Sequence, residues 1–513
     1  MAYGQGADKP IPRIPLVVPL ESRAGKLGMD AQLINAFAEK DEGEDYDVYK
    51  RPGVAQVATI PGMPTGNSYP LGKASVSFSD GNLPNFPASF SFFLNQSTLY
   101  SVQEVGSGVL NPSSPVGVYT GISYNNRYFP VSSLPVAYNA DYILVFFYPA
   151  LSLIFFNTSG TLTNTPYPGA SFPGLYVPGI AYLDSTVYVM DINNNIWGSN
   201  LGDPRTAWSS SNFIAASVIN GFACALSSNQ AFVIAFKSSS IEFFFDANNP
   251  TGSPLAAVPN SAIPTGCADG YSVQKYSNEI FFLATNNQSS YFFAKIVGTQ
   301  MQRISTPGVE RLLSGFSGQV SSFMIENNGH TFYGMTSFGL NITFVYDVRE
   351  GVWQIWTDQN GNYWPWAGVG ATGTSATTGP SITTLQYTTT NGAANTNLGN
   401  VYQVDKSFYT DIGNVVSTDI YTPNYDSGSR YKDTLKRMDF IADQQPGILK
   451  IRYNDDDFAP TKWSNFRGVD LNQRRPTLIN CGAFRRRCWN IRWQEPYPLR
   501  IEAVELDILP GTA

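Results

Sequence analysis

The sequence predicts an all-β protein, because both its composition and its strand patterns favour short strands joined by tight turns. The chain has 513 residues, with 45 glycines, 34 prolines and 14% aromatic residues. Charged residues make up only 14% of it, a composition typical of well-filled interiors and many turns rather than of long helices or disorder. Because this length exceeds one ordinary hydrophobic core, two or more domains are expected unless a repeated architecture carries most of the chain.

Such a repeat lies between residues 181 and 356. Each copy is a pair of short, aromatic-rich strands joined by a small polar turn, and the copies begin about 44 to 52 residues apart, which is the interval of a four-stranded propeller blade. The clearest copies are VYVMDINNNIWGS from Val187, AFVIAFKSSSIEFFF from Ala231, EIFFLATNNQSSYFFAKI from Glu279 and TFYGMTSFGLNITFVYDV from Thr331. Weaker copies at 88–105 and 141–156, with a candidate at 381–405, give a predicted β-propeller of six or seven blades.

Residues 1–61 are predicted to be an N-terminal arm, and residues 62–407 are predicted to be the propeller. In the arm, the stretch LINAFAE at 33–39 fits either a helical turn or a strand, because its periodicity is compatible with both. The Gly/Ala/Thr-rich segments at 368–380 and 391–400 have loop composition and are predicted to be long surface connections.

Residues 408–513 are predicted to form a β-sandwich-like C-terminal domain, because the blade rhythm stops there and charged strands begin. In the strand FRRRCWNIRW, alternate side chains share a face. One face holds Arg485, Arg487, Trp489, Ile491 and Trp493, and the other holds Arg486, Cys488, Asn490 and Arg492. About half of all Lys and Arg lie between residues 430 and 500, although the net charge of the chain is -7.

No recognisable catalytic motif accompanies the repeat. His330 is the single histidine and no nucleophile motif lies near it, so a structural role is preferred over a catalytic triad. The four cysteines lack the spacing of a zinc site. The NDDD run at 454–457 lacks the spacing of a calcium loop and is interpreted as a hairpin turn. The sequence therefore predicts no metal site, no cofactor and no enzymatic activity.

Charged residues leave two functional alternatives open. Propellers often carry sugar chemistry at their axis, and glycoside hydrolysis would need paired carboxylates. The acids available in the blades are Asp184, Asp191, Asp203, Glu242, Asp246, Asp269 and Glu279. The basic strand at 484–493 fits either phosphate contacts or an ion-paired subunit interface, and its alternation favours contacts to two different neighbours.

Neither a membrane span nor a secretory signal is predicted. The most apolar stretch, YILVFFYPALSLIFF at 142–156, is shorter than the roughly 20 residues that a spanning helix needs and contains Pro149, so it is predicted to be two core strands around a turn. The start MAYGQGADKPIPRIPLVVPL places charges and prolines where a signal peptide needs an apolar run. We therefore expect reduced thiols and no membrane insertion.

Several motifs follow one another in an order that resembles the tail nozzle, or packaged-DNA stabilisation, proteins of short-tailed bacteriophages. They are LINAFAE, KRPG at 50–53, GC at 266–267, RISTPGVE at 303–310, TFVYDVREGVWQIW at 343–356, RRRCWNIRW and the terminal LRIEAVELDILPGT. The order spans nearly the whole chain, and RISTPGVE after the GC blade is its most specific part. The matched motif residues are Asn35, Glu39, Arg51, Gly53, Gly266, Cys267, Arg303, Ser305, Thr306 and Glu310.

The resemblance implies a homohexameric ring at the distal end of the virion tail, assembled in the bacterial host cytoplasm. Such a ring attaches to a head-to-tail adaptor, extends the DNA channel, retains the packaged genome and anchors tail fibres or spikes. The arm and the C-terminal domain are expected to make the subunit and adaptor contacts, through Arg485, Arg486, Arg487 and Arg492.

An acidic propeller would let double-stranded DNA pass without sequence specificity, because neutralisation by Lys and Arg is what makes DNA bind. The alternatives are a propeller of a phage tail that binds or degrades carbohydrate, and a lectin-like propeller with no assembly role.

Overall fold

The computed structural model describes residues 12–17, 32–40, 46–59, 176–386, 400–426 and 431–511, apart from residues 203, 205–207, 287–289, 328 and 376–378. Between residues 70 and 166 it describes the strands and their pairing. The helices of this described part are α1 (Pro307–Leu313) and the 3-10 turn η1 (Gly270–Ser272), and everything else that is regular is β-strand. None of the described helices has the length and apolar character needed to cross a membrane. The prediction of an all-β fold is confirmed.

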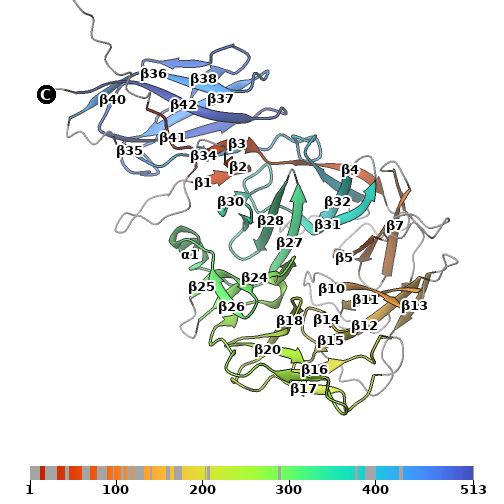
Figure 1. The fold of residues 1–513 in the computed structure, drawn as a ribbon. Helices are drawn as coiled ribbons and strands as arrows, with labels where there is room; N and C mark the ends of the chain where they lie inside the picture. The colour runs from red at the N-terminus through yellow and green to blue at the C-terminus, as the bar shows by residue number, and fades with distance from the viewer. Residues whose placement is uncertain are drawn as a thin grey trace, which may run out of the picture.

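Seven sheets in the described chain each contain a path of four antiparallel strands (Figure 1). The first three are β5 (Pro70–Ser77), β6 (Ser89–Asn95), β7 (Thr98–Val105) and β8 (Val109–Pro112), with β9 (Gly117–Val118) beside β7; β10 (Ser132–Tyr138), β11 (Asp141–Tyr148), β12 (Ala150–Phe156) and β13 (Leu162–Pro166); and β14 (Ala181–Leu183), β15 (Thr186–Met190), β16 (Asn195–Gly198) and β17 (Phe213–Ala215). The apolar stretch at 142–156 contains two strands, β11 and β12, which pair in antiparallel from Tyr142 with Phe156 to Tyr148 with Ala150, as predicted.

The next three sheets hold the last three of the four clearest sequence repeats. They are β18 (Ala223–Ser228), β19 (Val233–Lys237), β20 (Ile241–Asp246) and β21 (Leu255–Ala257); β22 (Gly266–Cys267), β24 (Glu279–Thr285), β25 (Tyr291–Val297) and β26 (Gln300–Arg303), with β23 (Gln274–Tyr276) beside β24; and β27 (Val320–Asn327), β28 (His330–Ser337), β29 (Ile342–Asp347) and β30 (Val352–Trp356). This succession of four-stranded sheets agrees with the propeller fold predicted from the repeat, and the blade number of six or seven stays a prediction.

Aromatic side chains fill the space between neighbouring sheets. The rings of Phe236 in β19 and Phe282 in β24 meet edge to face at 5.1 Å. One sheet further on, Phe281 in β24 stacks on Tyr333 in β28 at 5.4 Å. Such pairs add to the burial of apolar area, so the aromatic content noted in the sequence is used mainly for packing between sheets.

The seventh sheet is completed by a strand from the N-terminal region. Its path is β31 (Trp366–Ser375), β32 (Gly379–Gln386), β33 (Asn400–Asp405) and β4 (Gly53–Thr59). The pairing of β4 with β33 joins the beginning of the propeller region to its end. The segment 368–380, predicted to be a surface loop, instead contributes to the pair β31 and β32, because its small residues are held by antiparallel pairing interrupted by two register shifts. The predicted connection at 391–400 lies outside the described residues except for Asn400.

Two layers of strands face each other in a C-terminal sandwich, and the first of them continues the sheet of β27 to β30. One contains β34 (Thr418–Tyr421), β41 (Arg486–Trp493), β37 (Ile448–Asn454) and β38 (Arg467–Asp470), with β35 (Tyr425–Asp426) beside β41. The other contains β2 (Ala36–Lys40), β3 (Tyr46–Lys50), β42 (Arg500–Leu509), β36 (Asp433–Ala442) and β39 (Thr477–Ile479), with β40 (Ala483–Phe484) beside β36. One apolar core, which includes Trp489, Ile491 and Trp493, lies between them.

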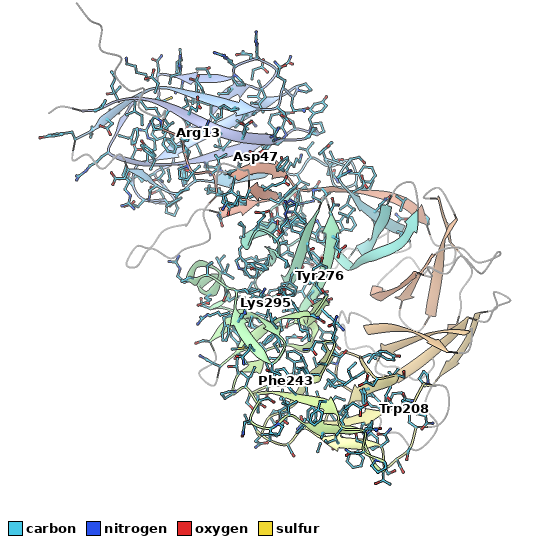
Figure 2. All side chains as sticks on the ribbon, in the orientation of Figure 1. Arg13, Asp47, Trp208, Phe243, Tyr276 and Lys295 are labelled. Atoms are coloured by element: carbon cyan, nitrogen blue, oxygen red, sulfur yellow. The ribbon has the colours of Figure 1, made fainter. Side chains whose placement is uncertain are left out.

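The N-terminal region is divided between the propeller and the sandwich. Residues 12–17 run beside β42, where Ile14 donates to the Val504 carbonyl at 3.0 Å and Ile14, Leu16 and Val17 join the sandwich core. In Figure 2, Arg13 lies among the sandwich strands, where it donates to Glu505 at 3.3 Å. The predicted arm is therefore corrected for residues 32–59, because β2 and β3 pair within the sandwich and β4 pairs within the propeller.

One sheet runs without a break from the propeller into the sandwich. Its central strand is β1 (Gln32–Ile34), which pairs in parallel with β30 and in antiparallel with β34. Figure 1 shows β1, β2 and β3 lying between β30 and the sandwich strands. The stretch LINAFAE is thus two short strands, β1 and β2, separated by Asn35, whose φ of 54° interrupts the strand. This answers the question that its periodicity had left open.

Candidate functional site

The junction between propeller and sandwich brings together two of the predicted motif residues, Asn35 and Arg51. Asn35 lies in the bend between β1 and β2, and asparagine adopts its positive φ more readily than most residues do. Its backbone N–H donates to the Ile355 carbonyl at 2.8 Å, and its own carbonyl accepts from the Arg51 N–H at 3.1 Å. The bend therefore touches both β30 of the propeller and the end of β3.

Every N–H of the Arg51 guanidinium has a partner within the chain, although the residue is only 2% exposed. Nε donates to Asn35 Oδ1 at 2.9 Å. Nη1 donates to the Pro52 carbonyl at 2.9 Å and to Asp411 Oδ1 at 3.0 Å, and Nη2 donates to the Thr357 carbonyl at 3.0 Å and to Asp411 Oδ2 at 2.6 Å. This is a two-pronged ion pair with Asp411, the geometry in which arginine binds a carboxylate most strongly.

The Asn35 side chain extends the same network. Its Nδ2 donates to Thr357 Oγ1 at 2.7 Å and to the Ser417 carbonyl at 2.8 Å. Its Oδ1 accepts from the Thr357 N–H at 2.8 Å as well as from Arg51. The junction cluster, which we define as Asn35, Arg51, Thr357 and Asp411, therefore ties the N-terminal region, the end of β30 and the segment before β34 to one another.

Lys50 lies next to the junction cluster and is also buried, with 6% of its surface exposed. Its Nζ donates to the Glu495 carbonyl at 2.8 Å. Burial, followed by the charge of the adjacent Arg51, lowers the pKa of Lys50 to about 8. The junction therefore holds two neighbouring buried cations, of which only Arg51 has a carboxylate against it.

Gly53, a third motif residue of this region, stands where the chain leaves the junction and enters β4. Its N–H donates to the Phe408 carbonyl at 2.7 Å. A Cβ at this position would lie 2.4 Å from the Thr410 carbonyl oxygen, which is backbone and cannot swing away. Only glycine fits this close approach of two chain segments.

The fourth motif residue of the N-terminal region, Glu39, is less strongly held. Its Oε1 lies 3.6 Å from Arg349 Nη1, and the side chains are 38% and 49% exposed. An exposed pair at this distance contributes little to stability, so Glu39 is not part of the junction cluster.

The motif RISTPGVE forms the exit from β26 into helix α1. Glu310 Oε1 accepts from Arg303 Nε and from Ser305 Oγ, both at 2.6 Å. Thr306 is the N-cap, accepting from the Val309 N–H at 3.5 Å, and Pro307 occupies the first helical position. The four predicted residues Arg303, Ser305, Thr306 and Glu310 thus make one local clamp, which belongs to the propeller and is separate from the junction.

Gly266 and Cys267 form β22, where the sheet begins. A Cβ on Gly266 would lie 1.9 Å from the Ser238 carbonyl oxygen of the preceding sheet, so glycine allows the two sheets to approach. Cys267 is buried, and burial raises the pKa of its thiol and raises that of Cys224 to about 12. Because the thiolate is the nucleophilic form, these cysteines are packing residues, and all four cysteines of the chain are free thiols.

The arginines predicted to contact other subunits have different environments, and for Arg487 the prediction is wrong. Arg487 is 1% exposed and donates to both carboxylate oxygens of Asp455, at 2.6 and 2.9 Å, and to the Cys481 carbonyl at 2.6 Å. It shares the face of Trp489 that is turned into the core, so an internal carboxylate compensates its charge. A neighbouring chain cannot reach it.

The other three arginines are more accessible. Arg486 lies 3.2 Å from Asp457. Arg492 donates from Nε to Asp419 Oδ1 at 2.6 Å and remains 27% exposed. Arg485 is exposed. The NDDD run at 454–457 is the turn after β37, as expected for a hairpin, and its role in pairing with Arg486 and Arg487 had no local signal in the sequence.

His330 and the described acids of the blades make local contacts. His330 is buried with Nδ1 at 2.7 Å from Asp347 Oδ2, and its ring stacks on Phe332. Glu242 pairs with the buried Lys237 at 2.5 Å, and Glu279 pairs with Lys295 at 2.7 Å.

The remaining acids cap turns or lie at the surface. Asp191, Asp246 and Asp269 accept from backbone N–H groups of the turns that follow them. Asp184 is exposed, and Asp203 lies outside the described residues. Within the described ranges, no group of three or more His, Cys, Asp or Glu is placed to hold a metal ion.

A family model described as "Bacteriophage P22 Gp10, beta-propeller", named Phage_stabilise, matches residues 176–379. Residues 176–379 are therefore similar to the phage stabilisation family. The match confirms the resemblance proposed from motif order, and it covers the GC and RISTPGVE motifs. Over these residues the chain is therefore similar to the β-propeller of a phage stabilisation protein. The junction cluster, except for Thr357, lies outside the matched residues.

No curated protein matches the chain. Solved structures with some similarity include the crystal structure of BBS1N in complex with ARL6DN, YCF48 from Cyanidioschyzon merolae and the computationally designed Ika8 protein. In that order, sequence identities are 8%, 10% and 10% and TM-scores are 0.38, 0.38 and 0.35. The alignments cover 70%, 69% and 75% of this chain and 98%, 99% and 99% of the other chain.

Proposed function

We propose that this chain is the nozzle subunit of a short-tailed phage and assembles into a homohexameric ring that extends the DNA channel. The ring would retain the packaged genome, attach to a head-to-tail adaptor and anchor fibres or spikes. The observation that carries the proposal is the family match of the propeller over residues 176–379. It is supported by the junction, because a propeller fixed rigidly to a second domain suits a subunit whose two parts have separate contacts to make.

The charge distribution supports passage of DNA through such a ring. Residues 1–407 contain 17 Lys and Arg against 25 Asp and Glu. A channel wall with this excess would not neutralise phosphates and would release no counterions from the duplex, so DNA would slide past it.

The test is the mass of the purified full-length chain, measured by light scattering and mass photometry and compared with negative-stain images. A sixfold mass and ring-shaped particles are expected. A monomer at all concentrations up to the micromolar range would contradict the proposal.

The carbohydrate alternative is tested on the same sample. Depolymerisation of a capsular polysaccharide by the wild-type chain would favour the alternative function, and the proposal expects none.

A further inference from the structure

The outer face of the sandwich sheet that contains β34, β41 and β37 carries a set of arginine and aromatic side chains. The guanidinium of Arg452 lies between two rings, with Cζ 4.8 Å from the centroid of Trp463 and 4.6 Å from that of Phe466. Arg492 also lies against Phe466, with its Cζ 4.9 Å from the ring centroid. We call Arg452, Arg492, Trp463 and Phe466, with the nearby Lys450 and Lys462, the stacked-arginine surface.

Arg452 differs from the other arginines of β37 and β41 in having no carboxylate partner among the described residues. Its Nε donates to Asn490 Oδ1 at 3.0 Å and its Nη2 donates to the Tyr421 hydroxyl at 3.4 Å. By contrast, Arg486, Arg487 and Arg492 each pair with an aspartate. Neutral partners and two rings hold the Arg452 guanidinium in place while its charge remains uncompensated.

Two lysines add to this charge. Lys450 pairs across the ladder with Arg492 and donates only to the neutral Gln494 Oε1, at 3.0 Å. Lys462 is exposed in the segment that carries Trp463. Of the four cations on the surface, only Arg492 faces a described carboxylate. The surface is therefore positive, partly apolar and already ordered.

These properties fit a protein partner that carries carboxylates. Arginine and aromatic residues are the types most enriched in the energetic centres of protein interfaces. A guanidinium held flat before binding has little side-chain entropy left to lose when it takes a carboxylate. A phosphate track would instead call for cations spaced along a groove, and here the rings occupy the centre of the surface.

A second copy of this chain offers the complementary charge. Residues 408–513 contain 15 Lys and Arg against 14 Asp and Glu, whereas residues 1–407 contain 17 against 25. Exposed acids of the described propeller include Asp184, in the turn between β14 and β15, and Glu326, near the end of β27. A ring is closed by contacts between two different faces of each subunit. The stacked-arginine surface and the exposed acids of the propeller could provide these two faces.

We propose that the stacked-arginine surface of one copy binds the exposed acids of the described propeller, such as Asp184 and Glu326, on the next copy. This inference rests on the proposed ring and names the face that closes it. Arg452 is the central contact, with Lys450 and Lys462 at its edge.

The experiment compares assembly of the full-length wild-type chain with Arg452→Ala and with the double variant Lys450→Glu, Lys462→Glu. The double variant changes only exposed or half-buried charges, so it tests the surface even if the loss of Arg452 disturbs folding. The matched control is Arg475→Glu, an exposed arginine before β39 on the other sheet. Mass photometry over a dilution series gives the dissociation constant, and near-ultraviolet circular dichroism reports the fold.

We expect Arg452→Ala to raise the dissociation constant of the ring at least about 30-fold, the loss typical of a central interface residue. The lysine double variant should weaken the ring, and the weakening should be greater at low salt than at high salt. Arg475→Glu should assemble like the wild type. If both surface variants assemble into rings as well as the wild type does, the proposed contact is wrong, while the proposed ring still stands. A wild-type chain that forms no ring would overturn the proposed function together with this inference.

Two further outcomes would also overturn the proposed contact. Equal weakening by Arg475→Glu would mean that overall charge, and not this surface, controls assembly. In a mobility-shift assay with linear duplex DNA, loss of binding by Arg452→Ala with an unchanged ring would assign the surface to nucleic acid instead.

Discussion

Blades and junction are stabilised by different interactions. Neighbouring blades meet through apolar contacts such as Phe236 with Phe282, and apolar cores tolerate swaps of similar volume at small cost. The junction depends on Arg51, whose charge is buried and whose hydrogen bonds reach three distant segments. A buried ion pair is strongly destabilising when one partner is removed, because the other charge is left without compensation. Removing one charge at the junction should therefore cost more than exchanging an apolar side chain between the blades for another of similar volume.

The largest effect is expected for Asp411→Ala. It leaves the Arg51 guanidinium buried with no carboxylate, so the free energy of unfolding should fall by about 3–5 kcal/mol. Urea unfolding followed by tryptophan fluorescence measures it, since Trp356 and Trp364 flank Arg51. The double variant Arg51→Met, Asp411→Leu removes both charges and should lose less than the sum of the single variants. A loss below about 1 kcal/mol for Asp411→Ala would mean that solvent or other groups compensate the charge.

Gly53→Ala tests whether the two chain segments at the entry to β4 are packed too closely to accept a methyl group. The new methyl group would collide with the Thr410 backbone, and overpacking of this kind costs about 1–3 kcal/mol. Thermal unfolding followed by circular dichroism gives the change. The matched control is Gly315→Ala, where the nearest atom to a Cβ is Leu340 Cδ2 at 3.5 Å. If both variants melt at the same temperature, the two chain segments can move apart at no cost.

Unlike the two substitutions above, Lys50→Met should raise the free energy of unfolding and so stabilise the protein. The folded-state pKa of Lys50 is lowered from 10.5 to about 8, so its charged form carries a cost below pH 8. That cost disappears as the pH rises from 8 to 10.5, because the folded chain loses the proton while the unfolded chain still binds it. The variant should gain about 1–2 kcal/mol at pH 7, and the gain should shrink toward pH 10.

Urea unfolding of Lys50→Met and the wild type, at pH 7 and at pH 10, measures this difference. A difference that does not depend on pH would show that Lys50 does not titrate in this range. Lys40→Met, at an exposed position of β2, is the control and should change neither the stability nor its pH dependence.

Glu39→Ala should have the smallest effect, below about 0.5 kcal/mol, because its pair with Arg349 is long and exposed. The measurement is urea unfolding at low and high salt, and high salt should reduce even this difference. A loss comparable with that of Asp411→Ala would extend the junction cluster to the surface and contradict the comparison between buried and exposed pairs.

The sequence predicted those parts of the fold that have a local period. Strand pairs such as that of Glu279–Thr285 with Tyr291–Val297 follow from aromatic runs on either side of a polar turn. Alternation in FRRRCWNIRW placed Trp489, Ile491 and Trp493 on one face, and they do lie in the core. The same alternation placed Arg487 with them, yet charge alone suggested a surface contact, because the sequence does not reveal that Asp455 reaches it.

The junction could be predicted only in part. Asn35 and Arg51 were selected through the motifs LINAFAE and KRPG, but their partners Thr357 and Asp411 stand in no motif. Asp411 lies 360 residues from Arg51 along the chain, and only the folded topology brings the two together. The Gly/Ala/Thr-rich segment at 368–380 was misjudged for a related reason, because composition describes local preference while pairing between β31 and β32 decides the outcome.

The pairing of β1 to β4 has a consequence for biosynthesis. These strands leave the ribosome first, but their partners β30, β33, β34 and β42 are all made in the last third of the chain. β2 and β3 can pair with each other early, but β1, β4 and the outer edge of β3 find their partners only late in translation, when the propeller closes and the sandwich forms. Contacts so distant in sequence are slow to form. A prematurely terminated product lacks the late strands β33, β34 and β42. It can therefore complete neither the propeller nor the sandwich, and it cannot present their surfaces to another subunit.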